Sequence, residues 1–270
     1  MKKSIYTIKS VFVLGLMLSS LNVNAGNEDR SGSAGASYLM VNPWARSSAL
    51  GDAGIASTKG LEATFTNIAG LASTEKTQIK FNYTNWMGSA GVTFNSAGIA
   101  QRISESSVIA VSIQSMGFGE IPITTAANPE GNIGTFSPSS TIFNIGYAKQ
   151  FSSTISGGIN FKILSESLSN LSATGVAIDA GVRYVTGEKD HIKFGITLRN
   201  VGPTMSYKGD GLAQQASYLN GTITASLEER SASFEMPSLL AIGGSYDFIF
   251  SEKSKLNLAL GFTANSFQND

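Results

Sequence analysis

The side chains that could carry chemistry are few and widely separated. The chain has one histidine, His191, and no cysteine, which excludes disulfides, thiolate–zinc sites and a cysteine nucleophile. His191 follows Asp190, but nothing in the sequence places a serine within reach of the imidazole, so a solvated turn histidine is the simplest interpretation. We therefore expect no enzyme activity, no metal site and no cofactor.

The charged residues and glycines also show no pattern typical of a catalytic, phosphate, calcium or nucleic-acid site. Asp179 and Arg183 share one face of a predicted strand, and we expect them to pair inside the protein. The stretches 117–119 and 157–158 contain glycine but lack the strand–loop–helix context of a phosphate loop, and no acidic cluster has calcium-loop spacing. The 19 basic and 19 acidic residues give zero net charge, and no Lys/Arg cluster indicates nucleic-acid binding.

The elements that must position these residues are strands. From residue 77 onward apolar residues recur at every second position, as in Val176-Ala-Ile178-Asp-Ala180-Gly-Val182, because successive side chains leave opposite faces of a strand. The pattern predicts about nine strands, at residues 77–86, 92–102, 107–116, 141–151, 154–164, 173–186, 191–200, 238–249 and 255–265.

Strand length and loop length favour a particular all-β class. The predicted strands have roughly 10 to 13 residues, the length that a tilted strand needs to cross a hydrocarbon layer. Every second connection is a tight turn, whereas residues 117–140, 165–172 and 201–237 form longer loops on the opposite side. This alternation predicts a transmembrane antiparallel β-barrel with lipid around it; a secreted β-sandwich is the alternative. Because such barrels have an even number of strands, we expect the sequence to lack C-terminal strands.

The pattern of the N-terminal residues is typical of an export signal. Lys2, Lys3 and Lys9 precede a short apolar run that ends at Val23-Asn-Ala25, which predicts a cleaved signal peptide over residues 1–25 rather than a transmembrane anchor. We expect a plug segment over residues 26–75 and the barrel over residues 76–270. Within the plug segment, Pro43 could open a short helix over residues 44–50 that Gly51 ends.

Two runs in this segment carry a resemblance: Ala45-Arg46-Ser-Ser-Ala-Leu50-Gly51-Asp52-Ala53-Gly54-Ile55-Ala56, and Asn67-Ile68-Ala69-Gly70-Leu71-Ala72. Together with Arg199-Asn-Val-Gly-Pro203 and Met236-Pro237 they resemble the PorV/PorQ family of outer-membrane barrels, which is related in fold to the FadL fatty-acid transporters. Ile68 stands where that family usually has proline. The resemblance implies a fourteen-stranded barrel with the N-terminal segment in its lumen.

The resemblance also implies a function and partners. It implies an outer-membrane component of the type IX secretion system that binds the translocon and the C-terminal signal domains of cargo, for export and surface attachment. We expect the plug contacts to be Trp44, Arg46, Asp52 and Asn67, with Arg46 paired to Asp52; alternatively Gly51 and Gly54 matter only as backbone bends.

The partner-binding residues are expected in the long loops, which could accept an extended segment by strand addition or could simply cap the barrel. The residues chosen are Ile121, Ile123, Phe136, Leu212 and Tyr218. A different class of function stays open: a FadL-like passive channel for hydrophobic solutes such as long-chain fatty acids, with a movable plug.

Overall fold

The structure, a computed structural model, describes residues 34–218, 223–251 and 254–267. The expected signal peptide lies outside the described residues. The chain forms one large antiparallel sheet in which nine strands follow one another in the order β1-β2-β3-β6-β7-β8-β9-β13-β14. Their bounds are β1 Thr77–Asn85, β2 Thr93–Arg102, β3 Ser107–Gly117, β6 Ser139–Gln150, β7 Ile155–Leu168, β8 Leu171–Thr186, β9 Ile192–Val201, β13 Leu239–Ile249 and β14 Lys255–Asn265.

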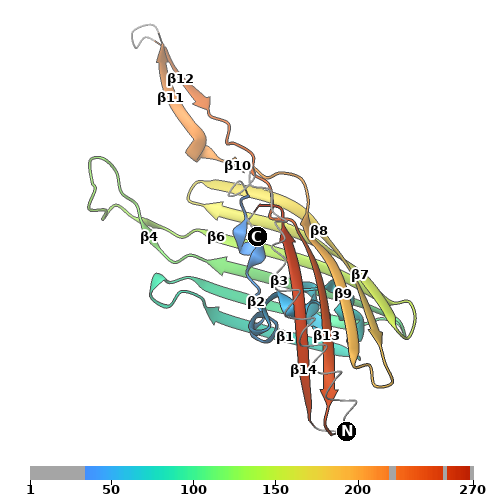
Figure 1. The fold of residues 1–270 in the computed structure, drawn as a ribbon. Helices are drawn as coiled ribbons and strands as arrows, with labels where there is room; N and C mark the ends of the chain where they lie inside the picture. Colours follow the sequence, from blue (N-terminus) through green and yellow to red (C-terminus); the bar gives the residue numbers. More distant parts are fainter. Residues whose placement is uncertain (1–33, 219–222, 252–253, 268–270) are drawn as a thin grey trace, which may run out of the picture.

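The predicted all-β antiparallel class and all nine long strands are therefore confirmed. Each strand pairs with its neighbour in an unbroken register, apart from a bulge between β8 and β9 at Ile178/Ala180. Within the described residues β1 pairs only with β2, and β14 only with β13, so these nine strands form an open, curved sheet and not a closed barrel (Figure 1).

The polarity of the sheet is the reverse of that in a water-soluble protein. On the outer face the side chains are apolar and exposed, for example Ile79 at 74% and Phe81 at 73%. On the inner face the side chains are often polar and buried, for example Asn160 at 0% and Asp179 at 2%. The strict alternation follows from the pleat, which sends neighbouring residues to opposite faces.

The connections differ between the two ends of the sheet. At what we call the short-turn end, the strands are joined by residues 103–106, 151–154, 187–191 and 250–254. At the opposite, long-loop end, two hairpins extend from the sheet: β4 (Ile121–Pro122) with β5 (Thr135–Phe136), and β11 (Ala213–Tyr218) with β12 (Ile223–Glu228), as Figure 1 shows. A short strand β10 (Tyr207–Lys208) pairs with β8.

One predicted loop is wrong. Residues 165–172 were expected as a long connection, but β7 and β8 continue to the pair Leu168↔Leu171. Only Ser169 and Asn170 join them, and Ser169 has a φ of 52° in the left-handed region. The run Ser165-Glu166-Ser167 concealed the end of β7, because Glu166 faces inward while both serines are exposed on the outer face, so polar residues on both faces interrupt the alternation.

The N-terminal segment, which we define as residues 34–76, lies against the inner face of the sheet. It is built from short helices: η2 Ser37–Met40, α2 Ala45–Ala49, η3 Gly51–Ile55, η4 Gly60–Thr64 and η5 Ile68–Ser73. The predicted helix at 44–50 is confirmed as α2, and Gly51 after it has a φ of 55°. No helix among the described residues is long and apolar enough to span a membrane.

Candidate functional site: the inner face and its recesses

The centre of the inner face is a buried ionic network around Asp179 of β8. Lys162 Nζ lies 2.7 Å from Asp179 Oδ2, and both side chains are at most 3% exposed. Asn160 Nδ2 donates to Asp179 Oδ2 at 3.1 Å, and the Asn200 backbone N–H donates to Asp179 Oδ1 at 2.8 Å. Lys162 also donates to Asn200 Oδ1 at 2.7 Å. These bonds supply the compensation that a buried ion pair requires.

The predicted pair between Asp179 and Arg183 is not formed. Residues i and i+4 share a strand face, but at about 3.3 Å per residue they stand roughly 13 Å apart. The carboxylate instead meets Lys162 and Asn160 from the adjacent strand β7. Arg183 turns away from it, toward the N-terminal segment.

Arginines from three strands bind main-chain carbonyls of that segment. Arg183 Nε donates to the carbonyl of Ala56 at 2.9 Å, and Arg102 donates to those of Ala72 and Thr74, each at 2.8 Å. Arg199 donates to the carbonyl of Phe65 and lies 5.2 Å from the centre of its ring. Short helices leave such carbonyls without intrahelical partners, so these arginines satisfy groups that would otherwise be buried unpaired.

Glycines of the sheet make room for the segment. A Cβ on Gly181 of β8 would stand 2.2 Å from Asn67 Oδ1, and one on Gly146 of β6 would stand 3.0 Å from Ile68 Cδ1. Asn67 caps η5 by accepting from the Ala69 N–H at 3.1 Å, and its Nδ2 donates to the Val182 carbonyl at 3.1 Å. The segment therefore approaches the backbone of the strands.

The other expected plug residues have different positions. Trp44 is 3% exposed and packs with Leu61 and Phe65 in a buried apolar cluster. Arg46 is exposed and lines a recess beside β1 and β14. The side chain of Asp52 lies outside the described residues, so its pairing with Arg46 stays a prediction.

The expected partner-binding residues lie on or beside the two hairpins. Ile121 of β4 is 39% exposed, whereas Ile123, Phe136 and Leu212 are half-buried. Tyr218 belongs to β11, but its side chain lies outside the described residues. The structure thus brings Ile121 and Phe136 together as a directly paired position of one hairpin and leaves Leu212 and Tyr218 near the other.

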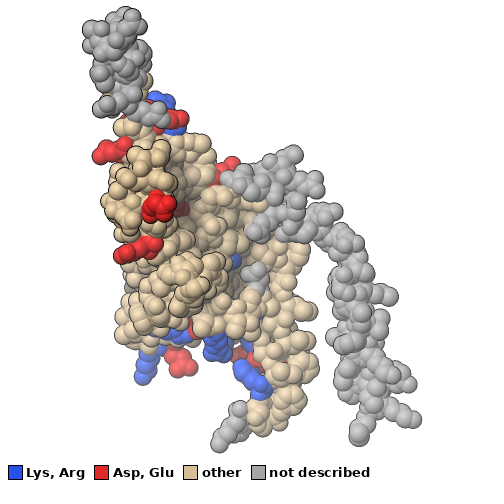
Figure 2. Space-filling view, turned by 90° about the vertical axis from the view of Figure 1, so that its left-hand side faces the viewer, with Lys and Arg blue, Asp and Glu red and all other residues tan. Residues whose placement is uncertain are grey.

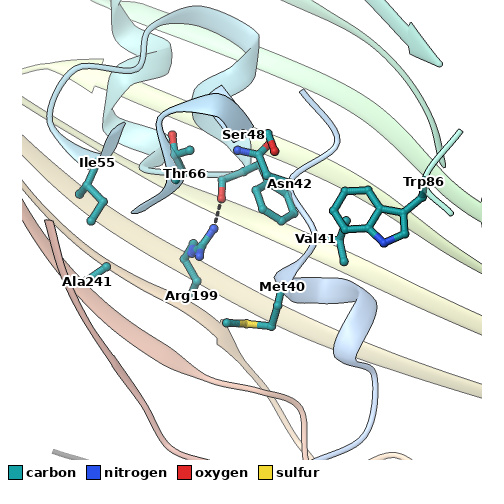
Figure 3. A pocket seen from close by; sticks show the side chains of 11 residues that line it. Met40, Val41, Asn42, Ser48, Ile55, Thr66, Trp86, Arg199 and Ala241 are labelled. Carbon is teal, nitrogen blue, oxygen red and sulfur yellow. Dashed lines mark hydrogen bonds between the residues drawn. The ribbon is translucent and has the colours of Figure 1, made fainter. Parts of the chain in front are cut away.

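The inner face contains a pocket of about 290 Å³ with both apolar and polar lining residues, which we call the inner pocket. Arg199, which donates to the Phe65 carbonyl, points into this pocket, and Figure 3 shows Met40, Ile55 and Ala241 around it. Thr66 Oγ1 is buried here without a hydrogen-bond partner among the described residues.

Two polar recesses lie toward the short-turn end. The larger, about 640 Å³, is the edge recess, and it is bordered by residues of the N-terminal segment, β1, β13 and β14. The smaller, about 180 Å³, is the short-turn recess.

Figure 2 shows charged side chains at the two ends of the visible face, with a broad uncharged band between them. Sequence reasoning missed both recesses, because their cations come from distant positions: Arg46, Lys59, Lys76, Lys80, Arg102, Arg183, Lys193 and Lys255.

Lys59 borders both recesses. Partial removal from water, followed by repulsion from Arg183, Lys193 and Lys255, lowers the pKa of Lys59 below its ordinary value, although its side chain is still exposed. At the long-loop end, burial and the hydrogen bond that Tyr207 donates to Glu166 raise the pKa of Tyr207 to about 12.

The lone histidine makes a structural contact. The His191 ring packs edge-on against Tyr246, with ring centres 5.2 Å apart. No group of three or more His, Asp or Glu residues in the described ranges is arranged to hold a metal ion.

These features define a class of protein. The chain is all-β, its sheet turns apolar side chains outward, and its inner face encloses polar networks and an inserted N-terminal segment, which is the polarity expected of a sheet in contact with lipid. Comparison with protein families then identifies the group: residues 24–266 match the family described as type IX secretion system protein PorV. The chain belongs to this family and is a type IX secretion system component. A comparison with curated proteins found no match.

Proposed function

We propose that this protein is an outer-membrane component of the type IX secretion system whose long-loop end binds the translocon, the C-terminal signal domains of cargo, or both. The observation that carries the proposal is the family match across residues 24–266, nearly the whole chain. The N-terminal segment serves as a lumenal plug in this proposal, and the apolar outer face contacts lipid.

The outer face supports the membrane part of the proposal. Its strands present rows of exposed large apolar residues, such as Ile159, Phe161 and Ile163 on β7. A water-soluble protein rarely exposes apolar patches beyond a few hundred Å², whereas a lipid-facing strand presents such a row at every second position. Aromatic residues near strand ends are candidates for an interfacial girdle: Tyr83, Phe151, Tyr184, Tyr246 and Phe248.

The two hairpins support the binding part. Each is a two-stranded sheet of its own, β4-β5 and β11-β12, and therefore offers unpaired main-chain groups along its edges. An extended peptide can add to such an edge, with main-chain hydrogen bonds giving affinity. Exposed Ile121 and Ile133 beside the β4-β5 hairpin would supply apolar contact.

The test replaces residues 213–228, the β11-β12 hairpin, with a short Gly-Ser turn in the producing cell. We expect cargo that carries the C-terminal signal domain to accumulate in the periplasm, while the variant still reaches the outer membrane. The matched control replaces Glu188 and Lys189, in the short turn at the opposite end, with Gly and Ser, and cargo export should persist. Normal export by the hairpin variant would contradict the proposed binding role.

A FadL-like channel is the alternative that the same cells test. A passive channel predicts slower uptake of long-chain fatty acids with normal cargo export when the gene is deleted. Opening it would require release of the N-terminal segment, which three arginines, Asn67 and the cluster around Trp44 hold against the sheet. These contacts favour the secretion role over a freely moving plug.

A further inference from the structure

Arg183 is a buried cation at the short-turn end whose hydrogen-bond partners are all neutral. It is 3% exposed, and its Nε and Nη1 donate to the Ala56 carbonyl at 2.9 Å and to Ser73 Oγ at 2.7 Å. Among the described residues it forms no ion pair. Taking a charge out of water is costly unless an opposite charge compensates it. The carboxylates of Asp190 and Asp247 lie near enough to attract Arg183, but neither forms an ion pair with it, so the guanidinium can accept a closer anion.

The short-turn recess beside Arg183 has an excess of positive charge. Arg102, Lys59 and Lys193 also line it, and Asp190 is the one carboxylate among its lining residues. Lys193 is paired with Asp247 at 2.5 Å, but Asp247 is shared with Lys255 at 3.2 Å.

Lys59 is the uncommitted cation of this group. Its side chain is exposed and, within the described chain, makes no hydrogen bond or ion pair. Arg183 and Lys193 lie near enough to lower its pKa, and the attraction of Asp247 only partly opposes them. Like charges are thus held together around a cavity of about 180 Å³, the size of a small polyatomic ion and not of a folded partner.

We propose that the short-turn recess binds a phosphate group, held by Arg183 and Lys59. With Lys193 paired to Asp247, the cations Lys59, Arg102 and Arg183 face the single carboxylate of Asp190, an excess of two positive charges. A phosphomonoester or free phosphate carries about −1.5 to −2 charges at neutral pH, which matches this excess, whereas a single carboxylate would neutralise only one charge. Its oxygens can accept from the planar guanidinium of Arg183 and from the point charge of Lys59 at once. The phosphate could be free in solution or belong to a lipid headgroup. The inference does not depend on the proposed secretion role.

The test measures phosphate binding to the mature protein in detergent by isothermal titration calorimetry at constant ionic strength. We expect one phosphate per chain to bind, with acetate binding at least tenfold more weakly. Lys59→Gln should weaken phosphate binding about tenfold, as expected for the loss of one charge-assisted contact. Lys189→Gln removes the same charge from the adjacent turn without touching the recess and should change affinity less than twofold.

A second variant and a second ligand keep the result decisive. Arg183→Gln should abolish binding; if heat-modifiable gel mobility shows that it fails to fold, Lys59→Gln alone decides. Nanodiscs containing phosphatidic acid, compared with phosphatidylcholine nanodiscs, distinguish the sources: a Lys59-dependent preference for phosphatidic acid identifies a lipid headgroup, and its absence with intact binding of inorganic phosphate identifies the free ion. Phosphate binding no tighter than that of acetate, or equal losses in Lys59→Gln and Lys189→Gln, would overturn the proposal.

Discussion

Gly181→Ala should loosen the N-terminal segment by displacing one side chain. The added methyl group would stand 2.2 Å from Asn67 Oδ1, so Asn67 must move and lose two hydrogen bonds, from the Ala69 N–H and to the Val182 carbonyl. Each bond contributes about 1 kcal/mol. Alanine also restricts the unfolded chain, which offsets about 0.5 kcal/mol, so we expect a net loss of about 1.5 kcal/mol in the free energy of unfolding.

The assay uses Trp44 as the reporter. Trp44 is buried within the segment's apolar cluster, whereas Trp86 is 41% exposed, so a Trp86→Phe background leaves fluorescence from the segment alone. Urea unfolding in phospholipid vesicles, followed at Trp44, should shift to lower urea in Gly181→Ala. The matched control is Gly244→Ala, because a Cβ there meets the Phe194 ring at an ordinary 3.6 Å and stability should stay within about 0.5 kcal/mol.

A double-mutant cycle separates this mechanism from general strain in β8. In an Asn67→Ala background the obstructed side chain is gone, so Gly181→Ala should then cost almost nothing. If Gly181→Ala costs the same with and without Asn67, the methyl group acts on something other than this contact and the reasoning is refuted.

Three further predictions concern the ionic network, the lipid face and pH. Lys162→Met leaves the Asp179 carboxylate buried without its cation and should cost about 3–5 kcal/mol in urea unfolding, much of which the added change Asp179→Leu should restore. Phe161→Arg, in the middle of β7 and 48% exposed, should cost about 2–4 kcal/mol in vesicles if this face meets lipid. The pKa of Tyr207 is raised to about 12 by burial and by its hydrogen bond to Glu166; the folded pKa exceeds the unfolded one, so this stabilisation is complete below pH 10 and is lost as the pH rises through about 12. Ultraviolet titration of tyrosinate should therefore lose a group that titrates near pH 12 in Tyr207→Phe, whereas buried Tyr38, whose pKa burial raises further still, should titrate later in both proteins.

Each of these predictions has a result that would contradict it. For the network, equal stability of Lys162→Met and the parent would show that the pair contributes nothing. For the lipid face, Ser153→Arg in an exposed turn is the control, and an equal cost at both sites would argue against lipid contact on β7. For pH, an unchanged amplitude of the titration near pH 12 in Tyr207→Phe would contradict the raised pKa of Tyr207.

The strands could be predicted because one rule governs them. Along a strand such as β1 or β14, apolar and polar residues alternate because the two faces of the sheet have different surroundings. This pattern is local in sequence and can be read from the strand alone. The contacts of the inner face depend on register between strands, which the sequence does not display. Asp179 was therefore assigned to Arg183 on its own strand, although its actual cation, Lys162, belongs to β7 and becomes a neighbour only through pairing.

The positions of the glycines in the strands have a structural reason that the sequence alone does not reveal. The 29 glycines indicate only a non-helical chain when the sequence is considered alone, yet several of those with inward positions mark where the N-terminal segment touches the sheet. An added Cβ would come within 3.0 Å of that segment at each of four strands, namely at Gly98 of β2, Gly146 of β6, Gly195 of β9 and Gly243 of β13. A sheet that enclosed only side chains would fill this space with larger residues. The sequence of the strands is therefore adapted to a segment already seated against them, and a change at either surface should be felt at the other.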